Sequence, residues 1–250
     1  MRLERGFSLI DLLVSISVMV ILMAILMPAV RMAHESARRV RCLSNIHQVG
    51  IAVGVYTDDH RGYLPPARFD EEPPASDYGR GTSAQSTPPA QNQSQEDDGA
   101  DTMFLRYRST NPFTNAPLWD GLGILIGDNY VNHPGVFYCP SHHGEHPFND
   151  YANEWVNGGG TIAGNYQYRI PPGITRITDL DRKTAIVADG MRTRLDYNHV
   201  IGNNFLKSDL SVGWYADVDG YVYQSLPERP RVRNADPRQH NPWQPMDDQY

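Results

Sequence analysis

Asp11 is the one charged residue between positions 6 and 30, and its placement calls for a chemical role. A carboxylate at membrane depth costs about 2.5–3.5 kcal/mol on insertion scales, so it is functional by default. Because a buried carboxylate also needs a counter-charge, Asp11 predicts a cationic partner. The alternative is a polar residue that is tolerated near the membrane boundary.

Cysteine and histidine side chains form a second candidate set. Cys139 is followed by His142, His143 and His146, and all four are zinc-ligand types. Their spacing is too compressed for a usual structural zinc site, so we predict a surface loop and no metal ion. Cys139 and Cys42 are the only cysteines in the chain, and they could instead form one disulfide bond in an oxidising compartment.

Acidic residues late in the chain suggest two further candidate sites, a catalytic pair and a calcium site. His199 and Asp209 are separated by nine residues, but no nucleophile and no Gly-rich oxyanion loop accompany them, so no enzyme is predicted. Asp209, Asp217 and Asp219 could bind calcium, although their spacing is not that of an EF-hand loop. We expect a turn without a metal ion and no cofactor, with calcium as the alternative.

Asp11, the first of these candidate residues, must lie on a single long N-terminal helix. Residues 7–30 are long enough to cross about 30 Å of hydrocarbon as one span. A cleaved secretory signal would have a shorter apolar run, and neither it nor a plain signal anchor explains Asp11. Pro28 is expected to kink the helix. Residues 31–56 predict an amphipathic continuation, because apolar side chains recur on one face at Val40, Leu43, Ile46 or His47, Gly50 and Val53.

The remainder predicts a small β-rich domain. Residues 31–66 end in a proline pair, and residues 67–102 contain almost no aliphatic side chains, which predicts a disordered insert. The globular part is assigned to 103–226, and the Pro-, Arg-, Asn- and Gln-rich residues 227–250 predict a flexible tail.

Within that globular part, alternating or β-branched stretches indicate several short strands. They lie at 136–141, 166–170, 184–188, 212–216 and 221–223, with a hairpin turn at 217–220 and a short helix or turn at 118–125. The predicted fold class is therefore α+β, with a long transmembrane and amphipathic helix packed on a small, mainly antiparallel sheet.

Composition excludes two classes of protein. The mean hydropathy of −0.50 excludes a protein with several membrane spans. The 250 residues carry a net charge of −7, whereas a general nucleic-acid binder should be basic. The charge is unevenly divided, because residues 1–57 carry +3 and the rest carries −10.

The sequence RGFSLIDLLV at positions 5–14 resembles the leader of type IV prepilins. The family has a short charged leader that ends in glycine, followed by Phe-Thr-Leu-Ile-Glu-Leu-Leu-Val. The resemblance implies cleavage after Gly6 by a prepilin peptidase, N-methylation of the exposed Phe7, and an assembly role for Asp11. Ser8 in place of Thr and Asp11 in place of Glu are the two departures.

A second resemblance is to large pseudopilin-like families with an H-X9-DG signature. It rests on residues 37–46, on the proline pair at 65–66, on the Cys-Pro-Ser at 139–141 and on residues 199–212. Cys42 and Cys139 lie where that family carries cysteines, and His199 and Asp209 match its signature. Leu210 replaces the family's glycine, so we expect that turn to differ. The favoured interpretation of the motif is a hairpin clasp, in which the His and Asp side chains bind loop backbone.

The two resemblances imply a pseudopilin-like filament subunit of a type II secretion or type IV pilus-like system. Its partners would be a prepilin peptidase, other pseudopilin subunits and inner-membrane lipids, with no nucleic acid. The chain would be a single-pass inner-membrane protein whose C-terminal domain is exported to the periplasm. The positive-inside rule alone favours the opposite orientation, but the leader match is more specific. The alternative is a membrane-anchored extracytoplasmic binding protein that uses a prepilin-type leader without polymerising.

Overall fold

The computed structural model describes residues 9–67, 100–110, 117–144, 146–157, 160–171, 173–199, 201–228 and 242–249. The predicted processing residues Gly6 and Phe7, and most of the predicted insert, lie outside these ranges. The architecture is a long N-terminal helix packed against a six-stranded antiparallel sheet. This confirms the predicted pilin-like α+β fold class.

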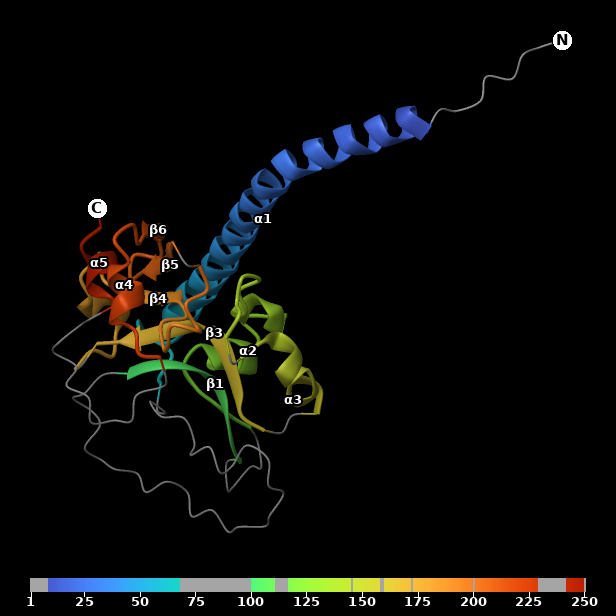
Figure 1. Cartoon of the computed structure of the whole chain (residues 1–250). Coiled ribbons are helices and arrows are strands. Elements are labelled where there is room, and N and C mark those ends of the chain that lie inside the picture. The colour runs from blue at the N-terminus through green and yellow to red at the C-terminus, as the bar shows by residue number, and fades with distance from the viewer. Residues whose placement is uncertain are drawn as a thin grey trace.

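Helix α1 runs from Leu9 to Asp59 and is 51 residues long. Its first half projects away from the rest of the molecule, and the helix bends partway along its length (Figure 1). Pro28 is the proline inside α1, and it bends a helix because it lacks an N–H and clashes with the preceding turn. The helix is long and apolar enough to cross a membrane, and its most apolar stretch is not buried by any described part of the chain.

The second half of α1 packs against the sheet. Its buried residues are Cys42, Ile46, Val49, Gly50, Ala52, Val53, Tyr56 and Thr57. The predicted face is confirmed at Ile46, Gly50 and Val53, but Val40 is 62% exposed and lies on the outer side. Val40 was misplaced because full burial of the helix begins only at Cys42.

The sheet has the strand order β2-β1-β3-β4-β5-β6, and all neighbouring strands are antiparallel. The strands are β1 (Ala100–Thr110), β2 (Pro117–Trp119), β3 (Ile162–Ile170), β4 (Ala185–Asp189), β5 (Gly202–Lys207) and β6 (Val212–Ala216). The strands predicted at 166–170, 184–188 and 212–216 are therefore confirmed. Strand β1 begins at Ala100, inside the segment predicted to be a disordered insert.

The sheet separates two apolar cores. Leu206 belongs to the core under α1, whereas its neighbour Phe205 belongs to a second core, because successive strand residues point to opposite faces. Helices α4 (Tyr221–Ser225) and α5 (Gln244–Asp247) contribute to that second core. Figure 1 shows both short helices on the other side of strands β4–β6 from α1.

Two predicted strands are wrong, and one part of the predicted tail is packed. Residues 136–141, predicted as a strand, begin in a 3₁₀ turn at Pro134–Phe137, and residues 221–223 form helix α4 and not the second arm of a hairpin. Apolar composition alone does not separate a short strand from a buried turn. Residues 242–249 lie in the predicted flexible tail, yet Trp243 and Met246 are 2% and 0% exposed. These two buried apolar side chains, together with the ion pair between Asp247 and Arg169, hold that part of the polar segment on the domain.

The remaining short elements connect these layers. Helix α2 (Ile124–Gly127) follows a 3₁₀ turn at Gly121–Gly123, which confirms the helix or turn predicted at 118–125 except at its first two residues, which belong to β2. Helix α3 (Ala152–Asn157) follows a further turn at Phe148–Tyr151, and a last 3₁₀ turn spans Ile177–Asp179.

Candidate functional site: a buried cysteine, histidine and aspartate cluster

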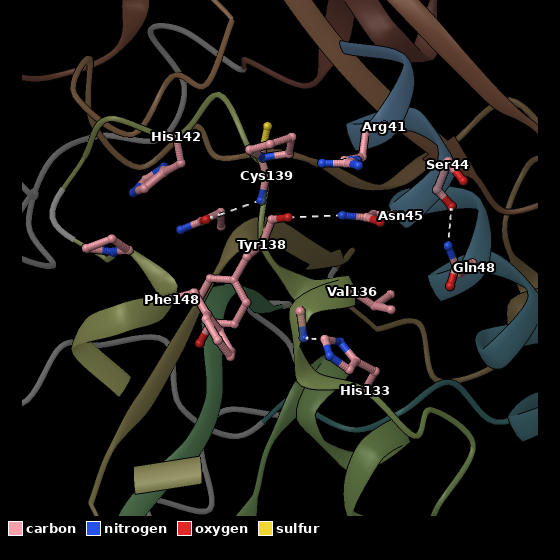
Figure 2. Close-up of a pocket in the computed structure, with 14 residues that line it drawn as sticks. Arg41, Ser44, Asn45, Gln48, His133, Val136, Tyr138, Cys139, His142 and Phe148 are labelled. Carbon is pink, nitrogen blue, oxygen red and sulfur yellow. Dashed lines mark hydrogen bonds between the residues drawn. The ribbon is translucent and has the colours of Figure 1, made fainter. Parts of the chain in front are cut away.

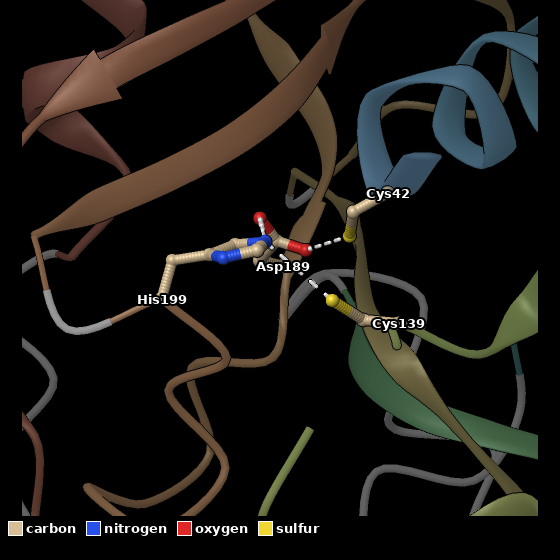
Figure 3. A group of neighbouring side chains, drawn as sticks. All are labelled: Cys42, Cys139, Asp189 and His199. Carbon is tan, nitrogen blue, oxygen red and sulfur yellow. Dashed lines mark hydrogen bonds and ion pairs between the residues drawn. The ribbon is translucent and has the colours of Figure 1, made fainter. Parts of the chain in front are cut away.

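Four chemically capable side chains from distant parts of the chain meet beneath α1. Cys42 comes from α1, Cys139 from the segment after Pro134–Phe137, Asp189 from the end of β4, and His199 from the loop before β5. One ligand-type atom from each lies within 4.8 Å of all the others. Figure 3 shows the four side chains converging on one point, and we call them the Cys–His–Asp cluster.

The contacts within the Cys–His–Asp cluster are short and all four residues are buried. The Cys42 thiol donates to Asp189 Oδ1 over 2.8 Å. Cys139 Sγ lies 3.5 Å from His199 Nε2, and that nitrogen lies 3.7 Å from Asp189 Oδ2. Both cysteines are free in the structure, so the predicted disulfide stays a prediction for a different oxidation state.

A second layer of polar groups holds the cluster in place. His199 Nδ1 lies 2.7 Å from Glu35 Oε1, and the buried Ser141 hydroxyl donates to both oxygens of the same carboxylate at 3.0 Å. Asp189 Oδ2 accepts from the backbone N–H of Asn204 at 2.7 Å and from its side-chain amide at 2.9 Å. These contacts fix the ring of His199 and the carboxylate of Asp189 in one orientation each.

Electrostatics inside the cluster favour a charged pair. Burial alone lowers the pKa of His199, but its contacts with Cys139, Asp189 and Glu35 outweigh burial and raise that pKa to about 9. Burial raises the pKa of Cys139, yet its hydrogen bonds with Cys42 and His199 bring the net pKa below the usual thiol value. Burial, followed by the contacts with Cys139 and Asp189, raises the pKa of Cys42. Cys139 is therefore the thiol of the pair that most readily becomes a thiolate.

A pocket of about 550 Å³ lies beside the cluster, between α1 and the segment around Tyr138. Figure 2 shows Cys139 at its edge, with Asn45 from α1 donating its amide to the Tyr138 carbonyl over 3.0 Å. Polar side chains, including Arg41 and Gln48, and apolar side chains, including Val136 and Phe148, line the rest of the pocket. The pocket therefore lies next to the Cys139 end of the cluster.

The histidines near Cys139 do not join it in one site. His142 Nδ1 lies 2.6 Å from Asn198 Oδ1, and His146 Nδ1 lies 2.6 Å from the Tyr151 hydroxyl, while His143 is exposed. The predicted surface loop is wrong for Cys139, which is 5% exposed and faces His199. The close spacing that argued against a zinc site was that of Cys139 with these three histidines, and the histidines do not converge on Cys139.

The predicted clasp is correct for one of its two residues. Asp209 accepts from the backbone N–H and the hydroxyl of Ser211 at 2.9 and 2.6 Å, and these bonds lower its pKa. His199 belongs instead to the Cys–His–Asp cluster, 2% exposed. The structure thus separates the two ends of the H-X9-D signature into a turn residue and a buried core residue.

The turn at Leu210 keeps the conformation expected of a glycine. Leu210 has φ +66°, a left-handed conformation that costs a side-chain-bearing residue about 1–2 kcal/mol. The expected difference from the family's turn stays a prediction. The Leu210 side chain packs against the core and reaches Gly54 of α1, where an added Cβ would come within 2.7 Å of Leu210 Cδ1.

The aspartates considered for calcium lie in separate places. Asp209 precedes β6 and Asp217 follows it, so the strand holds their carboxylates apart. The Asp217 carboxylate is 4% exposed and accepts from the Tyr197 hydroxyl and from the backbone N–H groups of Val222 and Tyr223 at 2.9–3.1 Å. Asp217 therefore caps α4, and the three aspartates do not form one calcium site.

Asp11, the predicted assembly residue, lies in the first turns of α1 and is exposed. Sequence reasoning did not select Asp189 or Glu35. Asp189 had a usable signal, because it is an acid that ends the apolar stretch 185–188. Glu35 had none, since it is one of several charged residues on an amphipathic helix.

The comparisons with known proteins agree with this architecture. Residues 31–196 match the family described as "Protein of unknown function (DUF1559)", which is more than half of the chain. Members of this family typically carry an N-terminal prepilin-type leader. No curated protein and no solved structure matches the chain significantly. The family match covers the second half of α1, strands β1–β4 and three of the four cluster residues, and the chain therefore belongs to the DUF1559 family.

Proposed function

We propose that this protein is a non-enzymatic, pseudopilin-like subunit that assembles through α1 into a type II secretion or type IV pilus-like filament. The observation that carries the proposal is the division of α1. Every residue from Leu9 to His34 is exposed, whereas the helix from Cys42 onward is packed on the sheet. A folded domain thus presents a bare apolar helix.

The exposed apolar surface of that helix must be buried against lipid or against other protein. Leu9, Leu13, Met23 and Ile25 are 62–84% exposed. Burying one such side chain is worth about 1.5–3 kcal/mol, so an apolar segment of this length is stable only in lipid or against other apolar helices. The proposal uses both covers in turn: inner-membrane lipid before assembly, and helices of neighbouring subunits in the filament.

Asp11 supplies specificity in this scheme. A prepilin peptidase would cleave after Gly6 and free the α-amino group of Phe7. That cation, on a neighbouring subunit, would neutralise Asp11 when both enter the apolar bundle, because an unpaired buried carboxylate is strongly unfavourable. The C-terminal domain would lie on the periplasmic side, held by the single span.

A second function is favoured by a different observation. The 550 Å³ pocket beside Cys139 combines polar side chains, including Arg41, Asn45 and Gln48, with apolar ones. This supports a membrane-anchored extracytoplasmic binding protein that takes a small polar ligand and does not polymerise.

Two measurements test the assembly proposal. Intact mass of the chain isolated from membranes should show a methylated Phe7 as the first residue, and a chain that still begins at Met1 would contradict processing. Asp11→Ala should leave cleavage intact but remove the subunit from pelleted, cross-linked filaments. Ser15→Ala is the matched control, since the Ser15 hydroxyl bonds only the Leu12 carbonyl of its own helix. Normal incorporation of Asp11→Ala would favour the anchored binding protein.

A further inference from the structure

We propose that Cys42, Cys139, Asp189 and His199 bind one divalent metal ion of the zinc class, and that this ion fastens α1 to the sheet. The predicted assignment of no metal to this chain is thereby replaced. The proposal concerns the folded domain and is independent of whether the chain polymerises.

The donor set selects the class of metal. Two thiolates, one imidazole nitrogen and one carboxylate oxygen are the ligands that zinc takes in proteins. Calcium and magnesium bind oxygen ligands and do not select sulfur. The cluster contains four donors from four residues, all buried, which is the ligand number of a closed structural site and not of a catalytic site with an open position.

Two of the donor–donor distances fit a tetrahedron. Metal–ligand bonds of about 2.0–2.3 Å place tetrahedral donor atoms about 3.3–3.8 Å apart. Cys139 Sγ and His199 Nε2 are 3.5 Å apart, and His199 Nε2 and Asp189 Oδ2 are 3.7 Å apart. Cys42 Sγ lies 2.8 Å from the other carboxylate oxygen of Asp189, Oδ1, to which its thiol donates a hydrogen bond. Metal binding would displace that proton and require these two groups to move apart.

The surrounding contacts are those that a metal site needs. A metal-bound histidine almost always donates its second ring N–H to a carboxylate, a carbonyl or water, which fixes its tautomer. Here Glu35 takes that position at His199 Nδ1. The Tyr166 hydroxyl lies 3.4 Å from Cys42 Sγ, and two N–H groups of Asn204 hold Asp189. Each of three ligands is thus oriented by its own outer partner.

The alternative is a disulfide between the two cysteines. Such a bond would use only the sulfur atoms. It would not explain why the imidazole of His199 and the fully buried carboxylate of Asp189 converge on the two cysteines. The convergence of all four donors favours metal over the disulfide.

The test begins with the full-length protein in detergent, purified without chelators or a histidine tag. Elemental analysis should find about one zinc per chain. After exchange with Co²⁺, the spectrum should show the visible bands of a tetrahedral site and a thiolate-to-cobalt charge-transfer band. Cys42→Ser and Cys139→Ser should each reduce that band by about half, and Asp189→Ala should weaken zinc binding at least tenfold.

Controls keep the outcome decisive if a variant folds poorly. His143→Ala changes an exposed histidine next to the cluster and should retain the metal. His199→Cys keeps four ligands and should retain zinc with a stronger charge-transfer band. The proposal is overturned if the reduced wild-type protein binds neither zinc nor Co²⁺, if Asp189→Ala retains full affinity, or if thiols trapped at cell lysis show a Cys42–Cys139 disulfide in the native protein.

Discussion

The ring of His199 is bound to Glu35 of α1 across 2.7 Å, although the two residues are 164 positions apart in the chain. The His199 side chain is 1% exposed and that of Glu35 is 41% exposed, so the contact runs from the interior to the surface. It joins α1 to the loop before β5 at the point where α1 leaves the sheet. The position of the exposed half of α1 therefore depends on the buried cluster.

Glu35→Ala should destabilise this junction. The buried N–H of His199 and the buried hydroxyl of Ser141 both lose their acceptor, at a cost of about 1–3 kcal/mol in the free energy of unfolding. Chemical denaturation in detergent measures the change. Glu35→Gln keeps an acceptor oxygen and should lie between the wild type and Glu35→Ala, and Asp150→Asn on an exposed acid should have no effect. Equal stability of Glu35→Ala and the wild type would show that the contact is not formed.

Gly50→Ala should destabilise the domain although alanine is the better helix former. An added Cβ at Gly50 would come within 2.6 Å of Cδ1 of the fully buried Leu206. Overpacking of this kind costs about 1–3 kcal/mol, which exceeds the helix-propensity gain of about 1 kcal/mol. The midpoint of thermal unfolding should therefore fall.

Gly54→Ala is the matched control for that substitution. Gly54 lies one turn later on the same face, and its Cβ would meet Leu210, which is only partly buried and can move. We expect the two effects to cancel to within about 1 kcal/mol. If both glycine variants are equally tolerated, the close approach of α1 to β5 is absent in solution.

Asp217→Ala should unfold the region around α4. The substitution leaves two backbone N–H groups and the Tyr197 hydroxyl without their acceptor in a buried site, which costs about 2–3 kcal/mol. Asp219→Ala, two residues later on an exposed carboxylate, should change stability by less than about 0.5 kcal/mol. Melting curves with calcium and with a chelator distinguish a calcium site, since only there would both variants abolish a calcium-dependent shift.

Trp243→Ala should show that the C-terminal segment is part of the fold. Trp243 is 2% exposed in the second core, and its ring lies 4.7 Å from the Arg169 guanidinium. Loss of a buried tryptophan costs about 3–5 kcal/mol. Gln244→Ala, at an exposed neighbouring position, should be neutral. Limited proteolysis should cut the Trp243 variant near residue 242 faster than the wild type, and equal rates would contradict the packing.

Much of the fold could be predicted because it depends on local pattern. The uninterrupted apolar run and the helical spacing that follows it define α1, which extends only a few residues past the predicted end at position 56. Alternation found β3, β4 and β6. It failed at 136–141 and 221–223, where short apolar stretches form turns and a helix, because a few residues carry too little periodicity to decide between them.

The candidate site shows the limit more clearly. The sequence by itself determined that the chain has an apolar N-terminal helix with one acid, Asp11. It also determined that the chain has two cysteines that could bind metal or form a disulfide, because these are properties of residue type and order. Only the tertiary structure decided that Cys139 faces His199 and Asp189 and not the histidines beside it in the chain. The reason is physical. Burial of the apolar core brings together four segments, namely α1, the segment after Pro134–Phe137, β4 and the loop before β5. Which polar groups meet there depends on how that whole core packs.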